Sequence, residues 1–589
     1  MLQALMAYGS NLDSEPGFKT REVRWCIELA KDGSFLNVLP LGDGRRGEIQ
    51  PRCPDMHGMN AGGKSHFLVE TAQTIALLFK ANEEERSIAR AKEKQQFFTE
   101  MLGQAAASCP ELSGVVNALE NPERQLEIRN ALAQHGAKPT DWLGWRVEGA
   151  DPRNSETVQS WWREWRKLDL GESSEANLQN PACDSMVCLL TGEQTQPLPT
   201  HPKITGLSGV GGIGMGDVMV GFDKAAFGSY GLDQSANAAI GAMVVQQYVD
   251  GLNDLVRNHS GKLANALVVH WFKERIVLED DPLEWLNGIE SEGATKASAH
   301  IAARNMLDAI RSGKRADLGN NHFYAMTISG ASGRVMVRDW MEGQFENLVI
   351  NVEAWFSDLA IALDANNTLA FDPKFYEVCL ALVRNDRTKS ISKNLEQLPA
   401  PTAATLWKVA VQRLPIPQPL MAQALARFRS DLIKDEPFNH ARMGLIRAYF
   451  FRLQPGSDTA MTAYLNPEHP EPAYHCGRLL AILANLQRAA LGDDVGAGVV
   501  QRYYASASQT PGLIIGRLAA NARNHLGKLD NRLAWWYEEQ IADVISRLGD
   551  AAPRTLDLNG QGLFALGYYQ QLAKLRTGNK SNDTNQGEK

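Results

Sequence analysis

Residues 58–65 could bind the phosphates of a nucleotide. They read GMNAGGKS and fit the P-loop pattern G-x-x-x-x-G-K-[ST] at every position. In a P-loop the glycines expose backbone N–H groups to phosphate oxygens, and the lysine approaches the terminal phosphates. Such a loop leaves a buried strand and enters a helix. A helix is expected over 67–78, whereas the prolines and charged residues before Gly58 predict no strand.

A nucleotide hydrolase also needs an acidic residue at the end of a second buried strand. The best candidate, IVLED at 276–280, is short and lies among charged residues, so it is a poor match. Nucleotide hydrolysis therefore stays as the alternative function, suggested by residues 58–65 alone.

A second glycine-rich stretch, GLSGVGGIGMGD, begins at residue 206 and contains the pattern G-x-G-x-x-G at 209–214. A dinucleotide-binding loop opens a helix, but residues 217–222 favour a strand. Two interpretations remain open, a flexible surface loop and a backbone that approaches a ligand closely. Either loop could contact phosphates or a DNA groove without nucleotide chemistry. The candidate DNA-binding residues are Asn60, Gly62, Gly63, Lys64, Ser65 and His66 in the first loop, and Lys203, Ser208, Gly209, Gly211 and Gly212 in the second.

A third candidate lies near the C-terminus. Residues 502–532 contain five basic residues and one acid, Asp530, in a chain whose formal net charge is −8. They could form a track for a single strand, or an ordinary solvated helix face. The basic residues are Arg502, Arg517, Arg523, Lys528 and Arg532. The nearby aromatics could stack on bases or belong to the core; they are Tyr503, Tyr504, Trp535 and Trp536.

The remaining composition excludes several classes of function. The seven cysteines are odd in number and mostly isolated, which indicates a reducing cytosol rather than a disulfide framework. Cys183 and Cys188 with His201 make a weak zinc set, since no second cysteine pair exists, and buried free thiols are the alternative. We expect no metal, no cofactor and no catalytic residues. The absence of a signal-peptide pattern and of a long apolar run predicts a cytoplasmic protein.

The hydrophobic periodicity predicts an α+β fold. Residues 24–30 and 34–38 read as one hairpin, and 322–329 and 334–340 as another, while helices are expected at 235–257, 296–312 and 344–363. Five prolines between 398 and 420 indicate a boundary. We expect a mixed body over 1–396, a connecting region over 397–460 and a helical bundle over 461–589. Its helices are expected at 474–491, 494–505, 511–525, 530–548 and 560–575, preceded by helices at 420–433 and 437–452.

Several stretches resemble one family, in the expected order over most of the chain. They are CLLTGE at 188–193, HPKITG at 201–206, GFDKAAFGSYG at 221–231, QSANA at 234–238, GRVMVRDW at 333–340, CGRLLA at 476–481 and RYYASASQTP at 502–511. Together with the opening MLQALMAYG, they are similar to the large subunit of the type I-C CRISPR Cascade complex.

The resemblance implies a non-catalytic subunit of a crRNA-guided complex. Such a subunit reads a protospacer-adjacent motif on duplex DNA, promotes R-loop formation, holds the displaced strand and helps recruit the helicase-nuclease, while the guide supplies sequence recognition. Its implied partners are the backbone, crRNA-processing and small subunits. The resemblance also implies a separate small subunit made from an internal start, for which Met461 is the best placed methionine.

Overall fold

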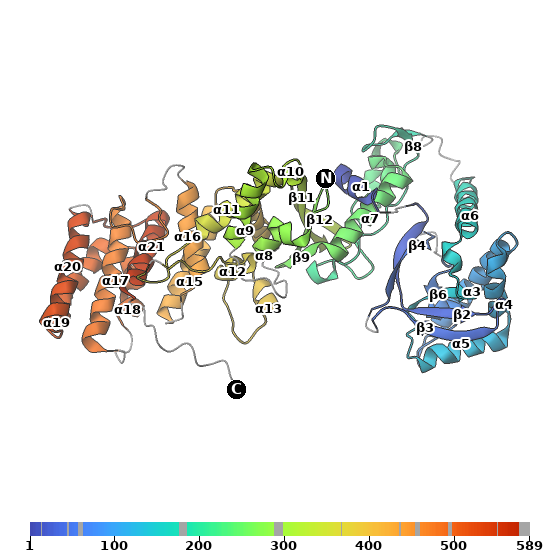
Figure 1. Ribbon diagram of the computed structural model, residues 1–589, viewed down its shortest axis with the longest axis horizontal. Helices are drawn as coiled ribbons and strands as arrows, with labels where there is room; N and C mark the ends of the chain where they lie inside the picture. Colours follow the sequence, from blue (N-terminus) through green and yellow to red (C-terminus); the bar gives the residue numbers. More distant parts are fainter. Residues whose placement is uncertain are drawn as a thin grey trace. The chain divides into compact units, whose positions relative to one another are not determined.

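Helices and short strands alternate through the first half of the chain, and helices dominate the rest (Figure 1). The expected α+β class is confirmed. The computed structural model describes residues 1–12, 15–43, 46–56, 63–175, 185–287, 299–366, 368–434, 438–453, 460–492, 498–549 and 552–576. Contacts divide the chain into two units, residues 1–258 with 330–336, and residues 259–329 with 337–589. The later helices share one hydrophobic core with strands of the second unit.

A four-stranded sheet with the order β3-β2-β6-β5 forms the centre of the first unit. β2 (Trp25–Leu29) and β3 (Phe35–Pro40) form the expected hairpin, β6 (Trp142–Val147) runs parallel to β2, and β5 (Glu70–Thr71) pairs antiparallel with β6. The sheet shares its core with α3 (Glu85–Ala106), α4 (Ser113–Glu120), α5 (Pro122–Gln134) and α6 (Glu156–Glu175). In that core Phe67 stacks on Trp162 with ring centroids 5.5 Å apart.

Two further substructures complete the first unit. β1 (Phe18–Val23) and β4 (Glu48–Pro54) pair as an antiparallel ribbon. α1 (Leu2–Gly9) crosses α7 (Ala242–Asn258) so closely that a Cβ on Gly9 would lie 1.9 Å from the carbonyl oxygen of Gln247. The connection before α7 holds β7 (Met186–Val187), β8 (Gln194–Thr195) and several short 3₁₀ turns.

The second unit contains a sheet with the order β12-β11-β10-β9. Its strands are β9 (Ser260–Leu263), β10 (Ala266–Phe272), β11 (His322–Ala331) and β12 (Arg334–Gln344), of which the last two form the expected hairpin. The neighbouring helices are α8 (Pro282–Asn287), α9 (Ala299–Arg311), α10 (Ala316–Gly319) and α11 (Phe345–Leu359). Buried residues of α11, such as Trp355, join this sheet to the helices that follow.

The rest of the second unit is helical. Its helices are α12 (Phe375–Ala381), α13 (Ile391–Leu395), α14 (Ala400–Val411), α15 (Gln418–Ile433), α16 (His440–Leu453), α17 (Pro472–Leu491), α18 (Val499–Ala507), α19 (Pro511–Leu526), α20 (Asn531–Leu548) and α21 (Leu558–Leu575). α17 is the central helix and contacts α18 to α21. Its crossing with α21 is close because glycines replace side chains there. A Cβ on Gly477 would lie 2.0 Å from the oxygen of Phe564, and one on Gly567 would lie 2.1 Å from that of Tyr474.

Candidate nucleic-acid interface

The first glycine loop is described only from Gly63 onward, so Asn60 and Gly62 lie outside the described residues. Gly63 has a φ of 92° and packs against α3, where a Cβ would meet the carboxylate of Glu93 at 3.2 Å. Lys64 is half-buried, and its Nζ lies 5.9 Å from the ring centroid of Phe97 on the same helix. This end of the loop is therefore fastened to α3.

Ser65 and His66 lie inside the first unit. The side chain of His66 places Nδ1 2.8 Å from the Asp55 carboxylate, and Arg21 lies 3.1 Å from the same carboxylate. The Arg21 guanidinium also covers the ring of Trp142 at 3.9 Å. Burial alone raises the pKa of Asp55, but the hydrogen bond from His66 and the charge of Arg21 outweigh it and hold that pKa well below its usual range. Of the loop residues that the structure describes, Lys64 is thus the one with access to solvent and a positive charge.

The P-loop context differs from the expected one on both sides. A strand does precede the loop, because β4 ends at Pro54, so the prediction of no strand was wrong. That strand belongs to a two-stranded antiparallel ribbon and not to a parallel sheet. The helix expected over 67–78 is also wrong, since this stretch contains β5 and only a four-residue helix, α2 (Ala72–Ile75). Among residues 63–71 no helix begins that could direct its N-terminus at a phosphate.

The second glycine loop is closed at its base and packed on one side. Ile204 and Asp217 pair as an isolated antiparallel bridge, and the Asp217 carboxylate accepts the backbone N–H of Ile213 at 3.2 Å. A Cβ on Gly211 would lie 2.8 Å from the oxygen of Gly330 at the turn of the second hairpin. The close backbone approach inferred from the glycines therefore exists, and it is made to the chain itself. The strand expected over 217–222 is limited to bridges at its first two residues.

The exposed members of this loop region are the ones free to meet a ligand. Lys203, Ser208 and Gly209 are all exposed, and a Cβ on Gly209 would meet nothing within 4 Å. At Gly212, in contrast, an added Cβ would lie 2.3 Å from the Asp217 carboxylate. Gly211 and Gly212 are therefore needed for packing within the chain. Lys203, Ser208 and Gly209 face outward.

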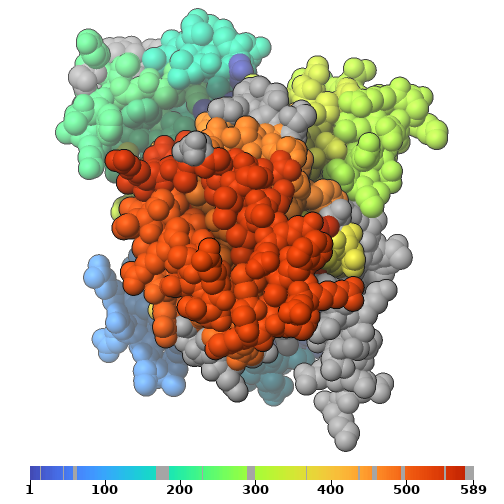
Figure 2. Space-filling model, turned by 90° about the vertical axis from the view of Figure 1, so that its left-hand side faces the viewer, coloured from blue at the N-terminus to red at the C-terminus, as the bar shows by residue number. Residues whose placement is uncertain are grey.

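The C-terminal basic residues form an exposed set on three helices and one turn at one end of the second unit. Figure 2 views the molecule from this side, with α18 to α20 in orange and red toward the reader. All five side chains are exposed, and none forms an ion pair with any residue that the structure describes. The acid among them, Asp530, accepts backbone N–H groups as the N-cap of α20. The five residues are Arg502, Arg517, Arg523, Lys528 and Arg532.

The nearby aromatics divide into two kinds. Tyr504 is buried among the rings of Phe428, Phe564 and Tyr568, so it belongs to the core. Trp535 is 63% exposed and could contact a partner. Sequence spacing could not separate the two, because both lie at helical intervals.

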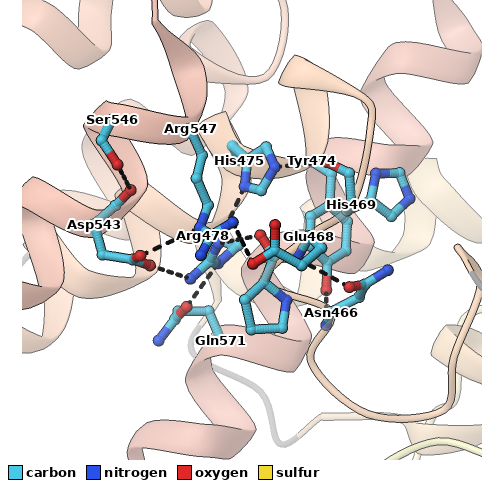
Figure 3. A network of polar contacts seen from close by, with 11 residues as sticks. Asn466, Glu468, His469, Tyr474, His475, Arg478, Asp543, Ser546, Arg547 and Gln571 are labelled. Carbon is cyan, nitrogen blue, oxygen red and sulfur yellow. Dashed lines mark hydrogen bonds and ion pairs between the residues drawn. The ribbon is translucent and has the colours of Figure 1, made fainter.

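A buried polar network fixes the helix that carries Trp535 (Figure 3). Arg478 on α17 is 3% exposed, and it donates to Gln571 on α21 at 3.0 Å and to Asp543 on α20 at 3.2 Å. Arg547 on α20 then pairs with Asp543 and with Glu468. Removing one partner of such a network leaves buried charge uncompensated. The network therefore holds α20 in a defined position relative to α17 and α21.

The candidate metal ligands have other partners. His201 shares a 2.6 Å hydrogen bond with the hydroxyl of Tyr248, and Cys188 is buried, while Cys183 lies outside the described residues. Elsewhere, His270 lies 2.8 Å from Asp281, which also caps α8 through the N–H of Leu283. Burial alone lowers the pKa of His270, but the charge of Asp281 raises it above its ordinary value. Glu284 lies 3.8 Å from the same imidazole, so His270 contacts two carboxylates.

Comparison with known proteins gives the chain its family. Among the described residues, no helix combines the length and apolarity needed to cross a bilayer. A search of curated proteins returns no match. A family model, described as CRISPR-associated protein (Cas_Csd1), matches residues 3–576. Because that match covers nearly the whole chain, the protein belongs to the Csd1 family of CRISPR-associated proteins, the large subunits of the type I-C Cascade complex.

Proposed function

We propose that this subunit recognises the protospacer-adjacent motif on duplex DNA, promotes R-loop formation and helps recruit the helicase-nuclease, without catalysing a reaction itself. It acts in the cytoplasm within a crRNA-containing complex of backbone, crRNA-processing and small subunits. Guide pairing supplies the sequence specificity, and the protein contributes duplex recognition and contacts to the displaced strand.

The observation that carries this proposal is the set of five exposed cations on α18, α19, α20 and the turn between the last two, which have no ion-pair partners among the described residues. In a chain with a net charge of −8, a concentration of positive charges without ion-pair partners suggests that a negatively charged ligand binds there. Phosphates of a single strand would supply the missing negative charge, and release of their counterions would drive binding.

The test compares two triple variants of the reconstituted complex. Arg517→Gln, Arg523→Gln and Lys528→Gln remove three cations from the candidate face. The matched control removes three exposed cations on or next to β10 and α9, which likewise form no ion pair with any described residue; its substitutions are Lys273→Gln, Arg304→Gln and Lys314→Gln.

We expect the first variant to weaken target-DNA binding and the control to leave it unchanged. Three lost contacts to single-stranded phosphates should make the slope of log K against log salt shallower by about 2, which corresponds to about 50-fold in affinity at 0.15 M salt. Equal affinities for both variants at every salt concentration would contradict the assignment.

The outward part of the second loop is proposed to contact the motif-bearing duplex, together with Lys64. Lys203→Gln should weaken binding to duplex target more than binding to a target already opened as a bubble, because the bubble bypasses motif recognition. Gly211→Val is a poor probe here, since its side chain would collide with Gly330 whether or not DNA is present. Equal loss on both targets for Lys203→Gln would argue against a role in recognition.

A further inference from the structure

Tyr230 is held in a backbone conformation that tyrosine rarely adopts. Its φ is 72° and its ψ is 13°, in the left-handed region that favours glycine. It lies between Gly228 and Gly231, either of which would adopt this conformation with less strain. Strained residues of this kind persist where the surrounding structure enforces them, and they concentrate at functional sites.

The same side chain is 98% exposed. No hydrogen bond, ion pair or ring contact joins it to any residue that the structure describes. The strained backbone therefore places the tyrosine ring in no packing contact that would stabilise the fold. A tyrosine that is both strained and unpacked requires an explanation outside the isolated subunit.

The loop around Tyr230 is anchored at several points. At its start, Val218 exchanges backbone hydrogen bonds with Gly333 and Val335 of the hairpin turn, at 2.8 and 3.0 Å. Inside it, Phe222 and Phe227 pack edge to face with centroids 5.3 Å apart. At its end, the N–H of Ser235 donates to the oxygen of Pro199 at 3.2 Å. The ring is thus presented on a supported turn.

The surroundings favour a nucleobase over a protein partner. The exposed residues beside Tyr230 are small or polar, among them Lys224, Gly231 and Asp233. A protein interface needs a contiguous buried area, which a single ring among such residues does not provide. One ring suffices to stack on one base or to enter between two, as apolar wedges do when they unstack DNA.

We propose that Tyr230 inserts beside the recognised motif and stacks on a base as the duplex opens. This inference rests on the proposed function, because it assigns the strand-separating contact to one side chain. It also gives the strain a purpose, since the left-handed turn directs the ring away from its own subunit.

The experiment measures duplex opening by the reconstituted complex with a defined guide. A target library randomised beside the guide-complementary sequence first selects a competent motif. A 2-aminopurine next to that motif then reports base unstacking, and the same sequence as a pre-opened bubble reports binding without opening. The variants are Tyr230→Ala, Tyr230→Phe and Tyr230→Gly, with Phe371→Ala as the control, because Phe371 is 94% exposed in the second unit.

Tyr230→Ala should slow opening of the duplex between about 5-fold and 150-fold, the range for losing one base–aromatic stack. Its rate of association with the bubble should change less than about twofold, because that target needs no base pair to be opened. The salt slope should be unaltered, because stacking releases no counterions. Tyr230→Phe and Phe371→Ala should behave as the unmodified protein.

Tyr230→Gly separates this role from a structural one. Glycine relieves the left-handed strain, so this variant should unfold at a higher temperature than the unmodified protein while opening DNA as poorly as Tyr230→Ala. An unmodified complex that opens no duplex would overturn the proposed function. An active complex in which Tyr230→Ala opens duplex normally, or loses equally on duplex and bubble, would overturn this inference alone.

Discussion

The close crossing of α17 and α21 leads to a prediction about the stability of the second unit. Gly477→Ala would place a methyl group 2.0 Å from the Phe564 oxygen and 2.8 Å from the Tyr568 nitrogen, whereas real Cβ contacts stay beyond 3.0 Å. Both obstacles are backbone atoms of a packed helix, so no side chain can rotate away. The helices must separate by about 1 Å, and they lose close packing along the crossing. We expect a cost of about 3 kcal/mol, at the upper end of overpacking.

Calorimetry of the full chain provides the measurement. Because a unit of this size unfolds with an entropy of about 0.7 kcal/mol/K, about 3 kcal/mol corresponds to a melting temperature lower by about 4 °C. Gly516→Ala on α19 is the matched control, because a Cβ there meets nothing within 4 Å and alanine favours the helix by about 1 kcal/mol. It should raise the melting temperature slightly. A Gly477→Ala protein that melts within 1 °C of the unmodified one would refute the reasoning.

Three further outcomes are expected. Burial lowers the pKa of His469 to about 4, and the charge of His475 adds to this effect, so folding favours the neutral imidazole. The stability of the protein should therefore fall as the pH drops from about 6.5 toward 4. Melting curves at pH 7 and pH 5 should show a smaller fall for His469→Gln than for the unmodified protein. Expression of the intact gene should yield a short co-purifying chain that begins at Met461, between the end of α16 and the start of α17. N-terminal sequencing identifies this chain, and a Met461→Leu variant that still yields it would count against translation from Met461. Lys64→Ala should leave phosphate release from ATP at background, as in the unmodified protein, and turnover that disappears with this variant would revive the nucleotide hydrolase.

The C-terminal helices were predictable because their signals are local. The start of α17 at Pro472 and the start of α20 after Asp530 follow common N-terminal preferences, and the intervening polar stretches mark the ends. The expected helices at 474–491, 511–525 and 530–548 agree with α17, α19 and α20 to within two residues at each end. The exposure of the basic residues on these helices followed from the same periodicity.

The first unit was harder to predict because its structure depends on distant partners. β4 is exposed or half-buried over its first five residues and pairs with one other strand, so its sequence lacks the alternation that indicates a strand. Residues 67–78 are apolar because they are buried, yet Leu68 and Leu77 have positive φ angles that no helix permits. The cluster around His66 draws Arg21, Asp55 and Trp142 from separate segments, so no local spacing could reveal it.

The backbone strain at Tyr230 could not be predicted from the sequence for a different reason. An aromatic residue between glycines reads as an ordinary turn, and only the backbone angles and the exposed ring distinguish it. Local patterns therefore predicted the C-terminal helices and suggested candidate surfaces, whereas the strain and exposure of Tyr230 emerged only from the geometry.

The pairing of α17 with α21 also determines when α17 can pack during synthesis of the chain. α17 is complete at Leu491, but its principal partner begins at Leu558, and the ribosome needs roughly 3–13 s to make the residues between them. During that interval a helix that is apolar around most of its circumference has no finished groove to enter. The nascent chain must be shielded until its last helix emerges, and a polypeptide started at Met461 faces the same wait. Ribosome stalling in this window, more than in any earlier one, should therefore expose the subunit to aggregation and proteolysis.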